Sequence, residues 1–142
     1  MLDCGIFIAS VYLETYTRQA QSLLQHLIAS ETLIHAPSLL HYELLAVSRK
    51  AVYQGRVTQE EGLIARDQLL SYPVTLHFDA PLLKRGYELA EALNRPTAYD
   101  AQYLALAERL SCEFWTTDER LVNAVTAKLT YVRWLGNWMA NN

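Results

Sequence analysis

The chain has 142 residues, of which 51% are hydrophobic and 19% charged. This length suits one domain, and the hydrophobic fraction is enough for a core, which argues against a disordered chain. The formal net charge of −3 argues against non-specific binding to bulk nucleic acid.

The sequence indicates a protein without a membrane anchor or a disulfide framework. No apolar run reaches the roughly 18 residues that a membrane helix needs, and the acidic beginning is not typical of a signal peptide. The two cysteines, Cys4 and Cys112, lie far apart and are expected to be reduced. The four histidines form no zinc-binding motif. We therefore expect a soluble cytoplasmic protein.

Short apolar runs alternate with longer periodic stretches along the chain. The runs predict strands at 2–4, 32–36, 74–78, 113–116 and 130–132. The stretches predict helices at 16–30, 38–53, 58–72, 81–94, 98–111 and 118–127. This order implies an α/β fold, a three-layer α/β/α sandwich with a mostly parallel central sheet of about five strands. We expect one domain over 1–142, with 133–142 as a C-terminal tail.

Helix-start signals support these boundaries. Thr58 with Glu61, and Thr97 with Asp100, have the spacing of a capping box. Pro81 lies at the start of a predicted helix, where its missing N–H is tolerated. The first strand is unusually short, because only two residues precede Asp3, and the natural start could lie upstream.

Four acids occupy positions that apolar residues would normally fill: Asp3, Glu43, Asp100 and Asp118. Each has apolar neighbours on its own helix face or in its own run, and an ionised group buried alone would cost several kcal/mol. Sites in parallel sheets lie at the carboxyl ends of the strands, where these acids could converge. Clustered carboxylates repel one another, and Mg²⁺ or Mn²⁺ would resolve that conflict.

Each acid also has an ordinary explanation. Asp118 could be a helix N-cap, Asp100 the acid of a capping box, and Glu43 the partner of a nearby cation. Asp3 could be an exposed terminal residue. The ordinary account needs all four explanations at once.

Other polar residues near these acids are candidates for supporting roles. Thr116, two residues before Asp118, could hydrogen-bond an acid or a water, or be an ordinary strand-end threonine. Lys50 follows Glu43 by seven residues and so shares its helix face. Together with Arg49 and Arg120, it could contact substrate phosphates, although a solvated surface role would explain all three cations.

Four segments carry a resemblance to a known family: LDCGIFI with Asp3, APSLLHYELLAV with Glu43, PTAYDAQYLALAERL with Asp100, and FWTTDERL with Thr116 and Asp118. In order and spacing they resemble the PIN-domain family and, within it, the VapC-like toxins of prokaryotic toxin–antitoxin pairs. The likeness covers nearly the whole chain.

The resemblance implies a metal-dependent endoribonuclease that hydrolyses RNA phosphodiester bonds. It implies that the four acids hold one or two Mg²⁺ or Mn²⁺ ions, partly through water. The implied partners are a small cognate antitoxin protein and a second copy of the chain, with 38–72 as a candidate dimer surface. One position departs from the family pattern: Gly5 stands where a serine or threonine is frequent.

The sequence also bears on three other classes of protein. A PIN-like binding or scaffolding module that has lost catalysis is the main alternative, favoured by Gly5 and the short first strand. An aspartyl-phosphate phosphatase usually has an aspartate at the position that Gly5 occupies. A dinucleotide-binding protein is not indicated, because the five glycines form no GxGxxG motif.

Overall fold

The computed structural model describes residues 1–139. In chain order its elements are α1 (Cys4–Val11), α2 (Thr17–Ala29), β1 (Ile34–Pro37), α3 (Leu39–Tyr53), α4 (Gln59–Ser71), β2 (Val74–His77), α5 (Ala80–Ala92), α6 (Tyr99–Leu110), β3 (Phe114–Thr116), α7 (Glu119–Val125), β4 (Val132–Trp134) and the 3₁₀ turn η1 (Leu135–Asn137). The α/β class is confirmed. No helix in this part of the chain is long and apolar enough to cross a bilayer.

The strands form two parallel pairs within residues 1–139, where a sheet of about five strands was predicted. β1 pairs with β2, and β3 pairs with β4. The expected first strand is reduced to Leu2, which makes one parallel bridge to Trp115. Asp3 already begins a helix, so too little chain remains to join the two pairs through a continuous central strand.

The prediction of a strand at 2–4 was wrong, and α1 was missed. Asp3 is the N-cap of α1, and its side chain accepts a hydrogen bond from the Ile6 N–H at 3.2 Å. Five consecutive residues of this helix are buried. A helix that is buried on all sides shows no amphipathic period, so its sequence is easily read as a buried strand.

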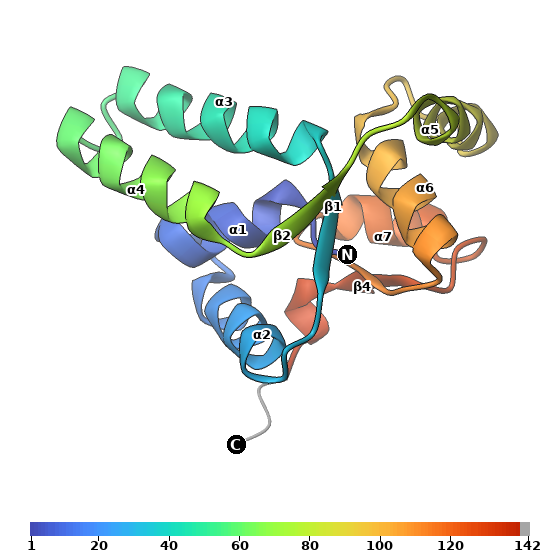
Figure 1. Ribbon diagram of the computed structural model, residues 1–142, viewed down its shortest axis with the longest axis horizontal. Coiled ribbons are helices and arrows are strands. Elements are labelled where there is room, and N and C mark those ends of the chain that lie inside the picture. Colours follow the sequence, from blue (N-terminus) through green and yellow to red (C-terminus); the bar gives the residue numbers. More distant parts are fainter. Residues whose placement is uncertain (140–142) are drawn as a thin grey trace.

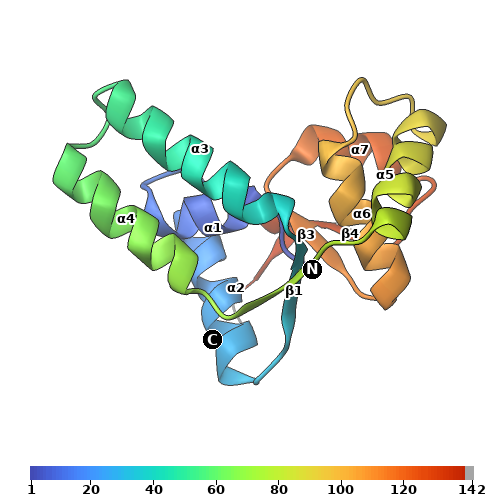
Figure 2. The same ribbon diagram turned by 45° about the horizontal axis from the view of Figure 1, so that its top comes forward.

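Figure 1 shows how the other elements surround α1. α3 and α4 form an antiparallel hairpin on one side, and α5, α6 and α7 gather on the other; both views agree (Figures 1 and 2). α1 contacts α2, α3, α4 and β3. α6 is buried continuously from Ala101 to Ala107, so α1 and α6 are the helices around which the core is built.

The α3–α4 hairpin is closed by local features of the sequence. Thr58 and Glu61 form the predicted capping box at the start of α4. Gly55, in the turn before it, has a φ of 69°, which favours glycine. α4 approaches α3 closely at Gly62, where a β-carbon would collide with Val52.

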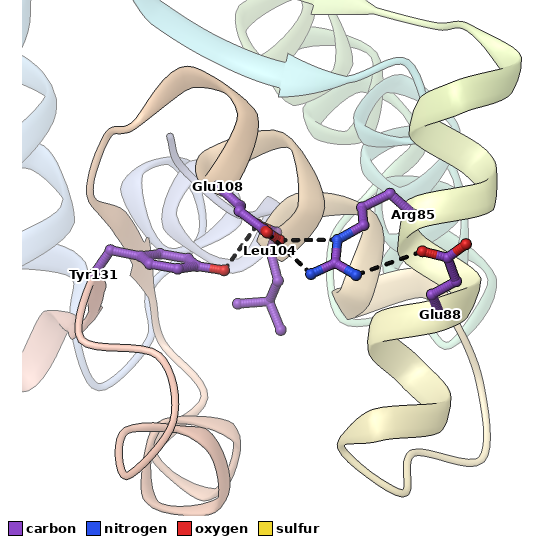
Figure 3. Close-up of polar contacts among 5 residues, drawn as sticks. All are labelled: Arg85, Glu88, Leu104, Glu108 and Tyr131. Atoms are coloured by element: carbon purple, nitrogen blue, oxygen red, sulfur yellow. Dashed lines mark hydrogen bonds and ion pairs between the residues drawn. The ribbon is translucent and has the colours of Figure 1, made fainter.

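Ion pairs hold α5 against α6. Arg85 donates to both carboxylate oxygens of Glu108, at 3.1 and 2.9 Å, and also pairs with Glu88 (Figure 3). In the same view, Tyr131 donates to the Leu104 carbonyl at 3.0 Å. These contacts fix α6, the helix that carries Asp100.

Several predicted boundaries were displaced. The second capping box was wrong, because Ala98 is the N-cap of α6 and Thr97 makes no cap. The last strand, expected at 130–132, is β4. Most of the segment named as a tail therefore belongs to β4, η1 and the residues that follow them, while 140–142 lie outside the described residues.

Candidate functional site

Asp3 lies between Leu2, which bridges to Trp115, and the first residue of α1. Its backbone N–H donates to the Trp115 carbonyl at 3.1 Å, which anchors it beside β3. The fully buried Thr116 hydroxyl donates to one Asp3 oxygen, and the Ile6 N–H donates to the other. Of the two interpretations of Thr116, the hydrogen bond to an acid is therefore the one that the structure shows.

Asp3 is half-buried, and desolvation raises the pKa of its carboxyl from 3.8 to about 6. Hydrogen bonds from Thr116 and two backbone N–H groups lower the pKa, and the charge of Asp100 raises it. The desolvation effect is the largest, so ionised Asp3 is not fully compensated by its protein neighbours.

Glu43 lies in the second turn of α3 and contacts α6 across the structure. The Tyr103 hydroxyl donates to Glu43 Oε2 at 2.5 Å. Burial raises the pKa of Glu43 above 4.5, the Tyr103 hydrogen bond lowers it, and the charge of Asp100 raises it. The expected pairing of Glu43 with Arg49 or Lys50 does not occur among the described residues.

Asp100 lies in the first turn of α6, where negative charge is favourable. Its carboxylate pairs with Arg95 at 3.5 Å. Because its charge raises the pKa of both Asp3 and Glu43, these three carboxylates form one electrostatic group. They come from α1, α3 and α6, elements far apart in the sequence.

Asp118 is connected to this group only indirectly. It is the N-cap of α7, and its carboxylate accepts from the Leu121 N–H at 3.0 Å. Its own N–H donates to the Thr116 hydroxyl oxygen at 3.0 Å. The ordinary N-cap explanation for Asp118 is thus borne out, and Thr116 links its backbone to the carboxylate of Asp3.

In residues 1–139, no three His, Cys, Asp or Glu side chains lie close enough to hold a metal ion as they stand. The donor chemistry nevertheless fits a hard divalent cation, because Asp3, Glu43 and Asp100 offer only oxygen ligands. A positive charge between them would offset the burial that raises the pKa values of Asp3 and Glu43. Burial and the charge of Glu43 also raise the pKa of the neighbouring Cys4 thiol far above its usual range.

Three supporting residues were missed from the sequence. Tyr103 donates to Glu43 from a position sixty residues further along the chain. Arg95 is the cation that pairs with Asp100. Thr117 fills the space that a side chain on Gly5 would need. Of these three roles, only that of Thr117 had a sign in the sequence, namely the adjacent pair of hydroxyl residues Thr116 and Thr117.

The predicted cations are distributed differently around the site. Lys50 lies about 20° around α3 from Glu43, on the same side, whereas Arg49 lies about 120° away. Arg49 instead lines a groove between α3 and α4 together with Arg66. Arg120 is exposed in the first turn of α7, two residues after Asp118.

Comparison with known proteins defines the class to which this fold and these acids belong. The family model of the PIN domain matches residues 1–126, and the chain belongs to the PIN-domain family. It is 35% identical over 121 residues to Ribonuclease VapC9 of Mycobacterium tuberculosis (strain ATCC 25618 / H37Rv), covering 85% of this chain and 87% of that one. Ribonuclease VapC12 of the same strain is 33% identical over 91 residues, 64% and 68% of the two chains. Ribonuclease VapC1 is 30% identical over 125 residues, 87% and 92%.

Proposed function

We propose that this protein is a metal-dependent endoribonuclease that hydrolyses RNA phosphodiester bonds, as the toxin of a type II toxin–antitoxin pair. The observation that carries the proposal is a set of three half-buried acids, Asp3, Glu43 and Asp100, of which Asp100 raises the pKa of the other two, in a chain of the PIN-domain family. The names of its relatives, VapC ribonucleases, supply the reaction and the RNA substrate.

Asp3, Glu43 and Asp100 would hold Mg²⁺ or Mn²⁺, with Asp118 at the margin of the site and water completing the ligand set. When bound, such a cation lowers the pKa of water and stabilises negative charge on phosphate oxygens. Direct binding by all three carboxylates requires side-chain rotation, because they are not grouped as they stand.

The chain's own hydroxyl groups orient the acids. Thr116 donates to Asp3 and accepts from the Asp118 N–H, which fixes the distance between α1 and α7. Tyr103 holds one oxygen of Glu43 and leaves the other free for a ligand. Lys50, on the Glu43 side of α3, and Arg120 are the cations proposed to contact substrate phosphates, whereas Arg49 points toward a different groove.

The proposed partners follow from the same relatives. A cognate antitoxin would restrain the nuclease in the cytoplasm, where its RNA substrate lies. A second copy of the chain is proposed to contact the 38–72 helical segment, which exposes Leu45, Tyr53, Leu63 and Ile64.

Cleavage of single-stranded RNA with Mn²⁺ or Mg²⁺ tests the proposal. We expect activity that EDTA abolishes, and a loss of at least a hundredfold in Asp100→Asn. Asp67→Asn is the matched control, because Asp67 is an exposed acid of α4 paired only with its neighbour Arg66. Activity that persists in Asp100→Asn, or in EDTA, would contradict the assignment.

The alternative is a PIN-like binding module without catalysis. The specific observation in its favour is that no ready-made group of three ligands exists among residues 1–139. Mn²⁺ binding that depends on Asp3, combined with no cleavage of diverse RNAs at high enzyme concentration, would decide for this alternative.

A further inference from the structure

A hollow of about 510 Å³ lies beside the acidic group, at the carboxyl ends of β1 and β2. Figure 2 shows these two strand ends side by side as they lead into α3 and α5. The first turns of α3, α5 and α6 form its walls, and its lining includes Tyr42, His77, Phe78, Leu83, Tyr99 and Gln102. We call it the β2–α6 hollow. Its volume is within the range of small-molecule sites.

The hollow is next to the proposed catalytic acids along two helices. Tyr42 directly precedes Glu43 on α3, and Tyr99 directly precedes Asp100 on α6. The hydrogen bond from Tyr103 to Glu43 joins these two helices, α6 and α3, at one of the acids. The hollow and two of the acids, Glu43 and Asp100, are therefore carried by neighbouring residues on the same two helices.

Three aromatic rings on the wall are largely exposed. The residue exposures are 74% for Tyr42, 73% for Phe78 and 61% for Tyr99. Rings that come from three different elements and line one hollow can accept a flat aromatic ligand by stacking. His77 keeps its imidazole beside them, paired with His35 at 3.0 Å.

The wall also contains a hydrogen-bond acceptor without a donor. Gln102 is only 9% exposed, and its amide oxygen has no partner among the described residues. Its amide nitrogen makes one long bond, 3.4 Å, to the Leu83 carbonyl. A buried acceptor left unpaired is unfavourable. Because this oxygen is itself covered, a ligand N–H would reach it once the Gln102 amide turns toward the hollow.

We infer that the β2–α6 hollow binds one unpaired base of the RNA, adjacent to the phosphate that is cleaved. The inference rests on the proposed ribonuclease function and adds a base-binding subsite to it. A nucleobase combines the two required features, a flat aromatic ring and ring or exocyclic N–H donors. A purely apolar protein side chain would fill the hollow but would leave Gln102 unpaired.

The test uses one cleavable single-stranded RNA and a series in which each nucleotide in turn is abasic. With the wild-type protein and Mn²⁺, we expect one abasic position beside the cleaved bond to lower kcat/KM by about five- to a hundredfold, the range for loss of a stacked base. Tyr42→Ala and Tyr99→Ala should lower kcat/KM on intact RNA by a similar factor. In these variants the same abasic position should have little further effect.

Tyr53→Ala is the matched control. Tyr53 lies on α3, is 81% exposed, and shares the side of the helix that carries Tyr42, three turns away from the hollow. In the Tyr53→Ala variant, the abasic position should lower kcat/KM by the same factor as in the wild type. Gln102→Met, which keeps length but removes the acceptor, should reduce the difference between the four bases at that position.

The outcomes separate this inference from the function on which it rests. In one outcome, the wild-type protein cleaves intact RNA while the abasic position lowers kcat/KM by the same factor in Tyr42→Ala and Tyr99→Ala as in the wild type. In that case the inference is wrong and the proposed ribonuclease function is unaffected. If the wild-type protein neither cleaves nor binds the RNA, both are wrong. If Tyr42→Ala lowers the molecular mass in sedimentation and leaves the abasic penalty intact, the hollow is a contact between copies, which also overturns the inference.

Discussion

The hydroxyl of Thr117 occupies the space that a side chain on Gly5 would need. The ideal β-carbon position at Gly5 also lies 3.0 Å from Asp3 Oδ1, so this space borders the candidate site. Gly5 departs from the serine or threonine that is frequent in the family, and Thr117 brings a hydroxyl to the same place from the loop after β3. The two residues are therefore expected to depend on each other.

Gly5→Ser should destabilise the protein by about 1–3 kcal/mol, because the new β-carbon collides with Thr117. Thr117→Ala should relieve the collision and leave a hydroxyl at position 5, so the double variant should be more stable and more active than Gly5→Ser. Urea denaturation and RNA cleavage of both single variants and the double variant measure the coupling. Strictly additive effects would show that the two residues are independent.

Asp3→Asn should stabilise the metal-free protein at neutral pH while abolishing cleavage. The folded protein holds Asp3 with a pKa of about 6, against 3.8 when unfolded. This carboxyl therefore favours the folded state most below pH 3.8, and that contribution is lost as the pH rises through 6. The amide oxygen of asparagine keeps the N-cap bond from the Ile6 N–H, and its amide N–H can donate to the Thr116 hydroxyl oxygen in place of the bond that Thr116 donates to Asp3.

The expected gain is of the order of 2 kcal/mol above pH 7 and close to zero near pH 4. Urea denaturation in EDTA at both pH values measures it. Asp67→Asn should show no such pH-dependent gain, because Asp67 is exposed. A loss of stability in Asp3→Asn at neutral pH would mean that ionised Asp3 is well compensated.

The sequence predicted those parts of the fold that depend on short-range signals. The Thr58–Glu61 capping box and the amphipathic helices were recognisable because each is determined by neighbouring residues. The α1 helix was not, because its fully buried run has no period. The Tyr103–Glu43 bond requires α3 and α6 to be placed relative to each other, and a single sequence does not supply that placement.

The assignment of the four acids to a site stays a prediction, and their arrangement differs from the expected single cluster. Asp100 raises the pKa of both Asp3 and Glu43, whereas the carboxylate of Asp118 caps α7. An N-cap aspartate and a metal-binding aspartate have the same sequence signature after a strand. Local pattern therefore could not separate the two roles.

Asp79→Asn should remove part of the acid sensitivity of the fold. A hydrogen bond from Arg109, and then one from the Leu82 N–H, lower the pKa of Asp79 to about 2, from 3.8. Its contribution is therefore complete above pH 3.8 and is lost as the pH falls toward 2. Asparagine preserves the cap on α5 and removes only the ion pair.

Thermal unfolding of both proteins between pH 5 and pH 2 is the measurement. The wild type should be more stable at pH 5, and the difference should shrink as the pH falls. Because Asp79 is exposed, the difference should also diminish at 1 M salt. A constant difference across this pH range would show that the Arg109 pair does not act through the charge of Asp79.

Tyr103→Phe should reduce cleavage without unfolding the protein, and it should change the pH profile. The phenylalanine ring keeps the packing against Phe114 but cannot donate to Glu43. That hydrogen bond lowers the pKa of Glu43 against the opposing effect of burial, so its loss should raise the pKa further. A larger fraction of Glu43 is then protonated at mildly acidic pH and cannot act as an anionic ligand.

We therefore expect kcat/KM to fall by about tenfold, the cost of one hydrogen bond to a charged group. The acidic limb of its pH profile should also move to higher pH. Tyr131→Phe is the matched control, because Tyr131 also anchors α6, through the Leu104 carbonyl, but does not touch Glu43. If kcat/KM falls by the same factor at all pH values in Tyr103→Phe and in Tyr131→Phe, Tyr103 acts only through packing. A shifted limb in Tyr103→Phe alone would establish that it positions Glu43 for the reaction.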